Sequence, residues 1–565
     1  MAMRIASRTP AVAMYKPYLV RITMGGVRAA SSASSPGLDL RPRNSRPSGR
    51  MTVFTGPNST KKSVISKIAE IAFSARPGFQ ERAAVILASP KHASWLTDKV
   101  FMTDLVSALE GARAAGPSFH VLAAVVDGLS PRTPSRELQE GLSIHLGLRD
   151  KLLPGLWDNT SPEGEQPNPP RGAESEPSSS LSILLPKKIN AKEARISLTL
   201  PLANTLFQNG KRSTLLVSKW GQVEGSGKLL FEMVRIAEKR SQVIDLPSTV
   251  AFDKVTIRAP LVPVTQPRKV LEGLGNILAK IEINGEPSPA SKELQTNIPR
   301  LLEARRALPQ GEAAAGRVGV WAFIYPQHMW SREADMVRFY SSIGGRYLGT
   351  ALGKMAYDMS TDPERLAWET QPVIRNAIFR GARLHRILGG GGEWGAKASL
   401  LSLDPHTSHS RDTEEDRLNK FIKSFHSEDD AKDAIAKPGD FVQFFVERDP
   451  VQLAPDKKDY LAAEPTDYPP ILFGVGDTNM KDIDPPSRVV ELRRLTDTKS
   501  PGWVALDHFG GHSAEGIYLS AGDVGPNTKL DVPGASVNMT TAKNVGVNSV
   551  PYRSFKRPVR LSGET

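Results

Sequence analysis

The sequence predicts a protein of the α/β or α+β class, in which mixed sheets are covered by helices. Residues 51–128 alternate short apolar runs with segments of helical spacing, which is typical of a βαβ arrangement. From Gly439 onward the chain is mostly a series of short β-prone segments. Of the 565 residues, 39% are hydrophobic and 24% are charged, so a packed core can form. We therefore expect a βαβ-like N-terminal half and a β-rich C-terminal half.

The N-terminal half should hold three strands separated by two helices. The strands are expected at Met51–Thr55, Ala83–Ala88 and Phe119–Val126, and the helices at Ser59–Ser74 and Ala93–Ala114. Because the later two strands are apolar without alternation, they favour a parallel sheet that is covered on both faces. An insert at residues 159–180, rich in Pro, Ser and Glu, predicts a disordered surface loop. The strand-like segments after it are Leu181–Leu185, Ile196–Leu200, Thr214–Val217 and Val255–Ala259.

The middle of the chain predicts a pair of helices. Pro267 opens a helix that runs through Leu278, and Ser288 caps a second helix with Pro289 at its first position. Pro299 should bend or divide this second helix. The segments expected next are a strand at Val318–Tyr325, one or two helices within Ser331–Met359, a charged loop with a short helix at His406–Ala436, and strands at Phe441–Val446, Ile471–Val475, Val489–Leu495, Trp503–Leu506 and Gly516–Leu519. We expect one domain over residues 51–330 and a second over residues 331–540.

The formal net charge of +13 is concentrated at the two ends of the chain. Residues 1–50 hold nine basic residues and one acid, residues 541–565 hold five and one, and the body between them holds 59 and 58. A nearly neutral body argues against a nucleic-acid surface that extends over a domain. The absence of cysteine excludes disulfides, thiolate metal sites and cysteine nucleophiles. No run of about 18 apolar residues occurs, which predicts no membrane-spanning helix.

The first fifty residues have the composition of a mitochondrial transit peptide and linker. Residues 1–35 contain five basic residues and no acid, and Arg28 leads into the small-residue run Ala29–Ser35. Transit peptides are rich in Arg and Ser and poor in acids, whereas Lys16 and Arg21 interrupt the apolar run that a secretory signal needs. The sequence therefore predicts import into the mitochondrial matrix. The alternative interpretation is a disordered basic arm without a targeting role.

A glycine cluster at Gly389–Gly395 is the most unusual local feature. Gly390, Gly392 and Gly395 have the spacing G-x-G-x-x-G, which can bring the backbone close to a phosphate. The cluster lies far along the chain rather than after the first strand of a βαβ unit, a context that does not favour nucleotide binding. Two interpretations remain, a turn that needs positive φ and a loop that binds a small anion. The side chains that could contact such a ligand are Arg383, His385, Arg386 and Lys397.

A second candidate segment is Asp507–Ser513. His508 and His512 lie beside an acid and a serine, which are the residue types of acid–base, metal or nucleophilic sites. The segment lacks the final glycine of a nucleophile elbow, and no third metal ligand is evident. A structural role for both histidines is the alternative. His406 and His409, with Asp404, are expected to face solvent beside the charged loop, and Asp127 and Asp477 are interpreted as turn or cap residues.

The basic tail after residue 541 interleaves cations with aromatic side chains. Tyr552 and Phe555 stand among four cations that could bind single-stranded RNA by charge and stacking, and these are Arg553, Lys556, Arg557 and Arg560. A tail that contacts an acidic protein surface or solvent is the alternative interpretation.

Two late segments carry a resemblance to a known family. Glu515–Pro526 reads EGIYLSAGDVGP, a stretch of small and aromatic residues that runs into a glycine–acid–apolar–glycine–proline sequence, and Pro438–Phe445 reads PGDFVQFF. Both resemble segments of the F-box and intracellular signal transduction (FIST) sensory domain, with which the α/β run to Val126 is compatible. No F-box precedes them, and the insert at 159–180 and the Gly389–Gly395 cluster depart from the family's pattern. The resemblance implies a ligand-sensing or protein-binding α+β module without catalytic residues to carry over.

These observations lead to three hypotheses. The first is a mitochondrial protein that binds a small anionic ligand or a protein partner through its glycine-rich loops, with the contact regions Gly389–Gly395 and Asp507–Ser513. The second is a factor bound to the mitochondrial ribosome or its RNA through the basic tail. The third is a hydrolase-like enzyme that uses His508, His512 and Ser513.

Overall fold

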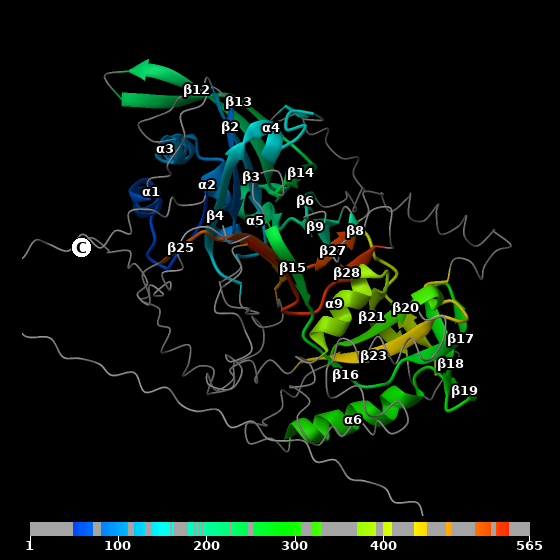
Figure 1. Cartoon of the computed structure of the whole chain (residues 1–565). Helices are drawn as coiled ribbons and strands as arrows, with labels where there is room; N and C mark the ends of the chain where they lie inside the picture. Colours follow the sequence, from blue (N-terminus) through cyan, green and yellow to red (C-terminus); the bar gives the residue numbers. More distant parts are fainter. Residues whose placement is uncertain are drawn as a thin grey trace, which may run out of the picture. The chain divides into compact units, whose positions relative to one another are not determined.

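A computed structural model confirms the mixed α+β class (Figure 1). Three of its four main sheets combine parallel and antiparallel pairs, whereas every pairing in the fourth is antiparallel. The C-terminal half is rich in strands. The residues that the structure describes are 49–71, 81–110, 118–129, 138–158, 161–162, 179–185, 188–189, 192–193, 196–225, 228–246, 252–306, 318–329, 370–390, 399–409, 434–448, 471–476, 503–520 and 527–541. Within these residues no helix has the length and apolar character that a membrane crossing requires.

An eight-stranded sheet, which we call the N-terminal sheet, organises the first half of the chain. Its strands are, in spatial order, β25 (Trp503–Leu506), β1 (Arg50–Phe54), β4 (Gly141–Leu148), β2 (Arg82–Ala88), β3 (Ser118–Val125), β12 (Leu215–Gly225), β13 (Lys228–Glu238) and β5 (Ser161–Pro162). The prediction of a parallel sheet is wrong except for the β2–β3 pair. Strand β4 follows β3 along the chain but lies between β1 and β2 in the sheet, and it is antiparallel to both.

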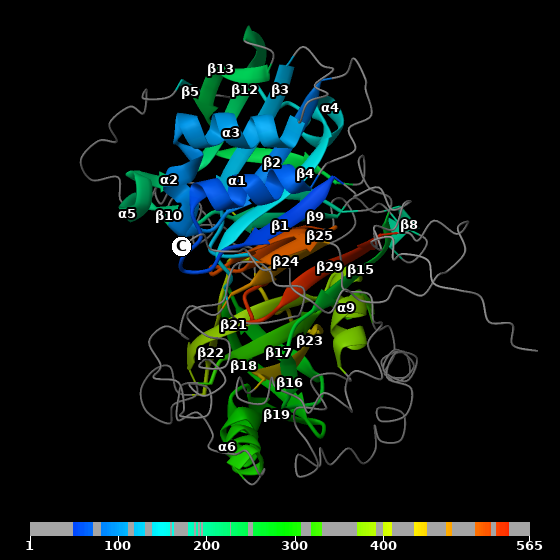
Figure 2. The same ribbon diagram turned by 90° about the vertical axis from the view of Figure 1, so that its left-hand side faces the viewer.

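Helices cover one face of the N-terminal sheet (Figure 2). Helix α1 (Lys61–Glu70) buries Val64 and Ile68, and α3 (Lys99–Glu110) buries Phe101 and Leu105 against the sheet. The single helix expected over Ala93–Ala114 is instead divided into α2 (Ala93–Leu96) and α3. Asp98 causes the division, because its Oδ1 accepts hydrogen bonds from the first free N–H groups of α3. The remaining short helices here are η1 (Pro90–His92), α4 (Arg149–Leu152) and α5 (Leu206–Asn209).

Two smaller sheets pack on the other face of the N-terminal sheet and share its core. The five-stranded sheet has the order β14 (Ser241–Asp245), β6 (Ser180–Leu184), β9 (Ser197–Pro201), β27 (Ile517–Ser520) and β28 (Thr528–Leu530). The four-stranded sheet has the order β15 (Phe252–Arg258), β29 (Ser536–Thr541), β24 (Ile471–Val475) and β26 (Phe509–Ser513). Short two-stranded pairs join β7 (Lys188–Ile189) to β8 (Lys192–Glu193) and β10 (Asn204–Thr205) to β11 (Lys211–Ser213).

A closed barrel forms the remaining core. The ring of six strands runs β17 (Arg268–Leu274), β18 (Ile277–Ile283), β22 (Leu401–Leu403), β21 (Arg383–Gly390), β20 (Val320–Tyr325) and β23 (Phe441–Glu447), and β23 pairs with β17 to close it. Strand β16 (Leu261–Pro263) adds to β23, and β19 (Glu286–Pro289) adds to β18. Helix α6 (Lys292–Arg306) packs Leu294 and Leu301 into the barrel core, and the other helical segments are η3 (Gln327–Met329) and α9 (Gln371–Phe379).

The predicted helix from Pro267 to Leu278 is wrong, because β17 and β18 form a hairpin there. Gly275, at φ 55°, occupies the first turn position between Leu274 and Ile277, which a two-residue hairpin turn favours. A second tight turn at Asn284 and Gly285, with φ 55° and 84°, leads from β18 into β19. The turn sequences Gly-Asn and Asn-Gly are typical of hairpins and therefore indicate strands on either side of them. The spacing of the apolar residues, which also fits a helix, pointed the other way.

The second helix of the predicted pair exists but begins later than expected. Ser288 and Pro289 belong to β19 rather than to a helix cap, and α6 starts at Lys292. Pro299 lies inside α6, which is a single helical element across that position. The expected helices within Ser331–Met359, the expected strand Val489–Leu495 and most of the insert at 159–180 lie outside the described residues.

All four main sheets draw strands from both sides of residue 330. The N-terminal sheet takes β25 from the end of the chain, and the five-stranded sheet takes β27 and β28. In the barrel, β16, β17, β18, β19 and β20 precede residue 330, and β21, β22 and β23 follow it. The sheets therefore do not divide at the boundary expected from sequence.

Gly390 has a structural role at the end of β21. Its φ of 121° is unfavourable for other residues, and a Cβ built on it would lie 1.9 Å from the carbonyl oxygen of Leu400. A Cβ on the neighbouring Gly389 would have no atom within 4 Å.

We expect Gly390→Ala to lower the free energy of unfolding by at least about 3 kcal/mol, because backbone strain adds to a clash with backbone. Gly389→Ala is the matched control and should change it by less than about 0.5 kcal/mol. Chemical denaturation of the two variants measures the difference. Equal stabilities would show that Gly390 has no special conformational role.

Candidate functional site

The structure places the residues predicted to bind a ligand in two different sheets. Arg383, His385, Arg386 and Gly390 belong to β21 of the barrel. His508 and His512 stand before and within β26 of the four-stranded sheet. Three other predicted contact residues, Gly392, Gly395 and Lys397, lie outside the described residues, as do Arg553, Lys556, Arg557 and Arg560 of the basic tail.

Alternation along β21 separates its three charged and polar side chains. His385 pairs with Ala322, whose side chain is in the barrel core, while the adjacent Arg386 pairs with Trp321 on the other face. His385 is buried, its Nδ1 lies 2.8 Å from the carbonyl oxygen of Asp404, and burial lowers its pKa to about 4. Arg383 donates from Nη2 to the Ile435 carbonyl at 2.6 Å. His385 and Arg386 therefore do not converge on one ligand.

His508 belongs to a buried polar cluster that fastens β26 to the N-terminal sheet. Its Nδ1 lies 2.9 Å from the Thr52 hydroxyl, which lies 2.8 Å from the Ser143 hydroxyl on the neighbouring strand. The Ser143 hydroxyl in turn accepts a hydrogen bond from the Gly510 N–H at 3.1 Å. Only 1% of His508 is exposed, so its position supports the structural interpretation.

His512 is enclosed in the four-stranded sheet. A Cβ on Gly474 would lie 2.4 Å from the His512 Nε2, so the ring occupies the space that this glycine leaves free. Burial lowers the pKa of His512 to about 4, and among the described residues its Nδ1 has no hydrogen-bond partner. Ser513 is the next residue along the strand and points to the opposite face, where its hydroxyl accepts from the Glu515 N–H. A Ser–His contact for a hydrolase is therefore absent from this described segment.

A group of charged and aromatic side chains meets where the barrel contacts the β27–β28 hairpin. We call it the Lys529 cluster, and its members are Trp321, Arg386, Asp404, His406, Tyr518, Lys529 and Asp531. They come from β20, β21, the segment after β22, β27, and β28 with the residue that follows it. The hairpin is held beside β21 by a hydrogen bond from the Leu384 N–H to the Thr528 hydroxyl at 2.9 Å.

The contacts of the Lys529 cluster form a closed circuit. The Lys529 ammonium lies 3.3 Å from the Asp404 carboxylate and 3.7 Å from that of Asp531. Trp321 Nε1 donates to Asp531 at 2.7 Å, and the Arg386 guanidinium lies 5.8 Å from the centre of the Trp321 ring. The circuit closes through the backbone, because the Asp404 N–H donates to the Arg386 carbonyl at 2.7 Å.

Two further side chains line the circuit. The His406 Nδ1 lies 2.8 Å from Asp404 Oδ1, and the side chain of His406 is 53% exposed. Tyr518 pairs across the hairpin with Lys529, whose ammonium lies 5.8 Å from the centre of the phenol ring. His406 thus fits the prediction of a solvent-facing residue, whereas Asp404 is buried and that expectation is wrong for it.

Burial and neighbouring charges shift the titration of this cluster. Burial alone would lower the pKa of Lys529, but Tyr518, Asp531 and Asp404 hold that pKa above its usual value. Burial alone would raise the pKa of Asp404, but the His406 N–H and the Lys529 ammonium keep it below its usual value. Burial raises the pKa values of Asp531 and Tyr518. At neutral pH the Tyr518 hydroxyl therefore keeps its proton and can donate it in a hydrogen bond.

No metal centre accompanies these groups in the part of the chain that the structure describes, since no three His, Asp or Glu side chains there are placed to hold an ion. The sequence motifs do not indicate the Lys529 cluster as a unit, although Arg386, Asp404 and His406 each stand out separately in the sequence. One sequence pattern could have suggested it, namely the polar residues that alternate with apolar ones along Tyr518–Ser520 and Lys529–Asp531.

The buried neutral histidines predict a loss of stability in mild acid. The pKa values of His92, His385 and His512 are lowered by burial to about 4 and that of His145 to about 3, whereas an unfolded histidine titrates near 6.5. Between these values the unfolded chain binds more protons, so the free energy of unfolding should fall as the pH decreases from 6.5 to 4. Each such histidine contributes a slope of about 1.4 kcal/mol per pH unit.

His512→Gln should reduce this slope by the contribution of one histidine, and the exposed His328→Gln should leave it unchanged. Denaturant unfolding at several pH values measures both. An unaltered slope in His512→Gln would mean that His512 is not held neutral by burial.

Comparison with protein-family models, with curated proteins and with solved structures finds no match for this chain. A function for the Lys529 cluster is therefore inferred from the chemistry of its own side chains.

Proposed function

We propose that the protein binds a small anionic ligand, a phosphate or carboxylate compound, at the Lys529 cluster. The proposal rests on the exposure of Arg386 and on the contacts that its guanidinium makes. Its side chain is exposed and lies against the ring of Trp321, and among the described residues no carboxylate lies within ion-pair distance of it. A guanidinium that is oriented by an aromatic ring and offers free N–H donors is well suited to a phosphate or carboxylate.

Lys529 and Tyr518 supply donors beside Arg386. The ammonium has three N–H groups, of which two are directed to Asp404 and Asp531, so one remains for a ligand. Tyr518 is partly exposed and keeps its hydroxyl proton. Lys529 and Arg386 together balance the charges of Asp404 and Asp531. The attraction for an anion therefore depends on the free N–H donors of Arg386 and not on a net positive charge of the cluster.

His406 offers a further polar atom at the Lys529 cluster. Its Nδ1 is engaged with Asp404, so Nε2 is the ring atom that can reach a ligand from this half-exposed side chain.

The proposal is tested by titrating the full chain with inorganic phosphate and with succinate in a calorimeter. Arg386→Met should weaken the binding of whichever anion binds by at least about tenfold, because it removes a charge-assisted hydrogen bond worth about 1.5–3 kcal/mol. The melting temperature should stay within the error of wild type, since the side chain is exposed. Arg212→Met, on the exposed strand β11, is the matched control and should bind as wild type.

Two results would contradict the proposal. One is the absence of saturable binding for both anions, and the other is equal affinity in wild type and Arg386→Met. Binding that is lost equally in Arg386→Met and Arg212→Met would reflect net charge rather than a site.

We propose further that the protein acts in the mitochondrial matrix, as the acid-free, Arg-rich segment at residues 1–35 suggests. Fused to a fluorescent protein, residues 1–35 should direct it to mitochondria, and N-terminal sequencing of the imported full chain should show a new start near Arg28–Ser35. Replacement of the five basic residues by glutamine is the control and should abolish import. A cytosolic fusion, or an uncleaved mature chain, would contradict this location.

A further inference from the structure

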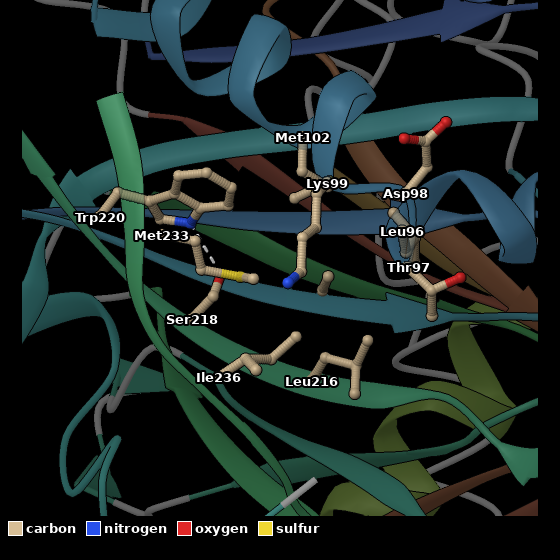
Figure 3. Close-up of a pocket in the computed structure, with 11 residues that line it drawn as sticks. Leu96, Thr97, Asp98, Lys99, Met102, Leu216, Ser218, Trp220, Met233 and Ile236 are labelled. Carbon is tan, nitrogen blue, oxygen red and sulfur yellow. Dashed lines mark hydrogen bonds between the residues drawn. The ribbon is translucent and has the colours of Figure 1, made fainter. Parts of the chain in front are cut away.

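A small pocket opens between α3 and the strands of the N-terminal sheet (Figure 3). Its volume is about 80 Å³. Seven of its eleven lining residues are apolar, namely Leu96, Met102, Ala123, Leu216, Trp220, Met233 and Ile236. The polar residues at its border are Thr97, Asp98, Lys99 and Ser218. It belongs to the helix-covered face of the sheet, so it is separate from the Lys529 cluster in the barrel.

Lys99, an exposed residue at the start of α3, brings its ammonium to the border of this pocket. Figure 3 shows its ammonium directed between Ser218, Met233 and Ile236 rather than away from the protein. Among the described residues no carboxylate lies within ion-pair distance of Lys99. Asp98, its neighbour in sequence, points away in Figure 3 and is engaged with the Lys61 ammonium at 2.5 Å and with the first N–H groups of α3.

Ser218 adds a hydrogen-bond donor on the opposite wall. Its hydroxyl oxygen accepts from Trp220 Nε1 at 2.8 Å, which fixes the oxygen and leaves the O–H proton for another acceptor. Ser218 is 5% exposed, so this proton is directed within the protein rather than to bulk water. An acceptor in the pocket can therefore contact the Lys99 ammonium and the Ser218 hydroxyl together.

The size of the pocket limits its ligand. An engineered apolar cavity of about 150 Å³ holds a benzene molecule, so a pocket of half that volume has room for an aliphatic chain of about three or four carbon atoms. We propose that this pocket binds a short-chain aliphatic monocarboxylate. The hydrocarbon chain packs against Trp220, Leu216 and Met233, and the carboxylate pairs with Lys99 and accepts from Ser218.

The experiment is a titration of the full chain with acetate, propionate, butyrate and hexanoate, followed by saturation-transfer NMR. Affinity should rise about fourfold per added methylene up to butyrate and then level off, because further carbon atoms find no apolar wall. Butan-1-ol and butylammonium should bind at least about fivefold more weakly than butyrate, because they lack the carboxylate.

Variants separate this pocket from other sites. Lys99→Met should weaken butyrate binding about fivefold, and the exposed Lys62→Met on α1 should have no effect. Ala123→Val adds two methyl groups to a lining residue, which narrows the pocket and should move the best chain length from butyrate to propionate. Arg386→Met should leave butyrate binding unchanged, so this proposal and the anion site at the Lys529 cluster can fail independently.

The proposal is overturned if butyrate does not bind saturably, if butan-1-ol binds as tightly as butyrate, or if Lys99→Met and Lys62→Met have the same affinity. A chain-length profile that still rises from butyrate to hexanoate would also overturn it, because the bounded pocket would then not be the site.

Discussion

The structure depends on two strands that bury both of their faces. In β23, Val442, Phe444 and Val446 pack inside the barrel, while Phe445 between them packs into the core shared by the other sheets. Strand β20 does the same, with Ala322 and Ile324 inside and Trp321, Phe323 and Tyr325 outside. Successive side chains of a strand point to opposite faces, so this one pair of hydrogen-bonded strands contributes side chains to two hydrophobic cores. Burial on both faces explains why β20 is continuously apolar in the sequence. In β23 the run is interrupted by the buried Gln443, whose Oε1 accepts a hydrogen bond from the Tyr325 hydroxyl.

The same alternation creates the Lys529 cluster. Because Trp321 must face outward from the barrel, its indole N–H meets Asp531 beside the β27–β28 hairpin, and the cross-strand position opposite it is Arg386. Burial of Asp404 and Asp531 would be unfavourable without a partner, and the Lys529 ammonium between them provides it. The cluster thus stabilises the contact between barrel and hairpin while leaving Arg386 exposed. One arrangement accounts for both the packing and the proposed binding of an anion.

Much of the N-terminal half could be predicted because its signals are local. The apolar runs around Val85 and Leu122 form β2 and β3, and the helical spacing around Val64 forms α1. The hairpin of β17 and β18 could not be predicted from helical spacing, because the apolar positions of Val270–Leu278 fit both periods and strand pairing decided between them. Likewise, no local pattern shows that β4 enters between β1 and β2, since that order results from pairing between distant segments.

The sequence by itself determined the mixed α+β class, the neutral body between two basic ends, and the individual residues that could take part in binding or catalysis. Tertiary structure alone decided which of those residues meet. His385 and Arg386 are neighbours in the chain but lie on opposite faces of β21, whereas Arg386 and Asp531 are far apart in the chain and are joined through Trp321. The physical reason is that local composition sets helix and strand periods, while a site is made by sheet pairings between segments hundreds of residues apart.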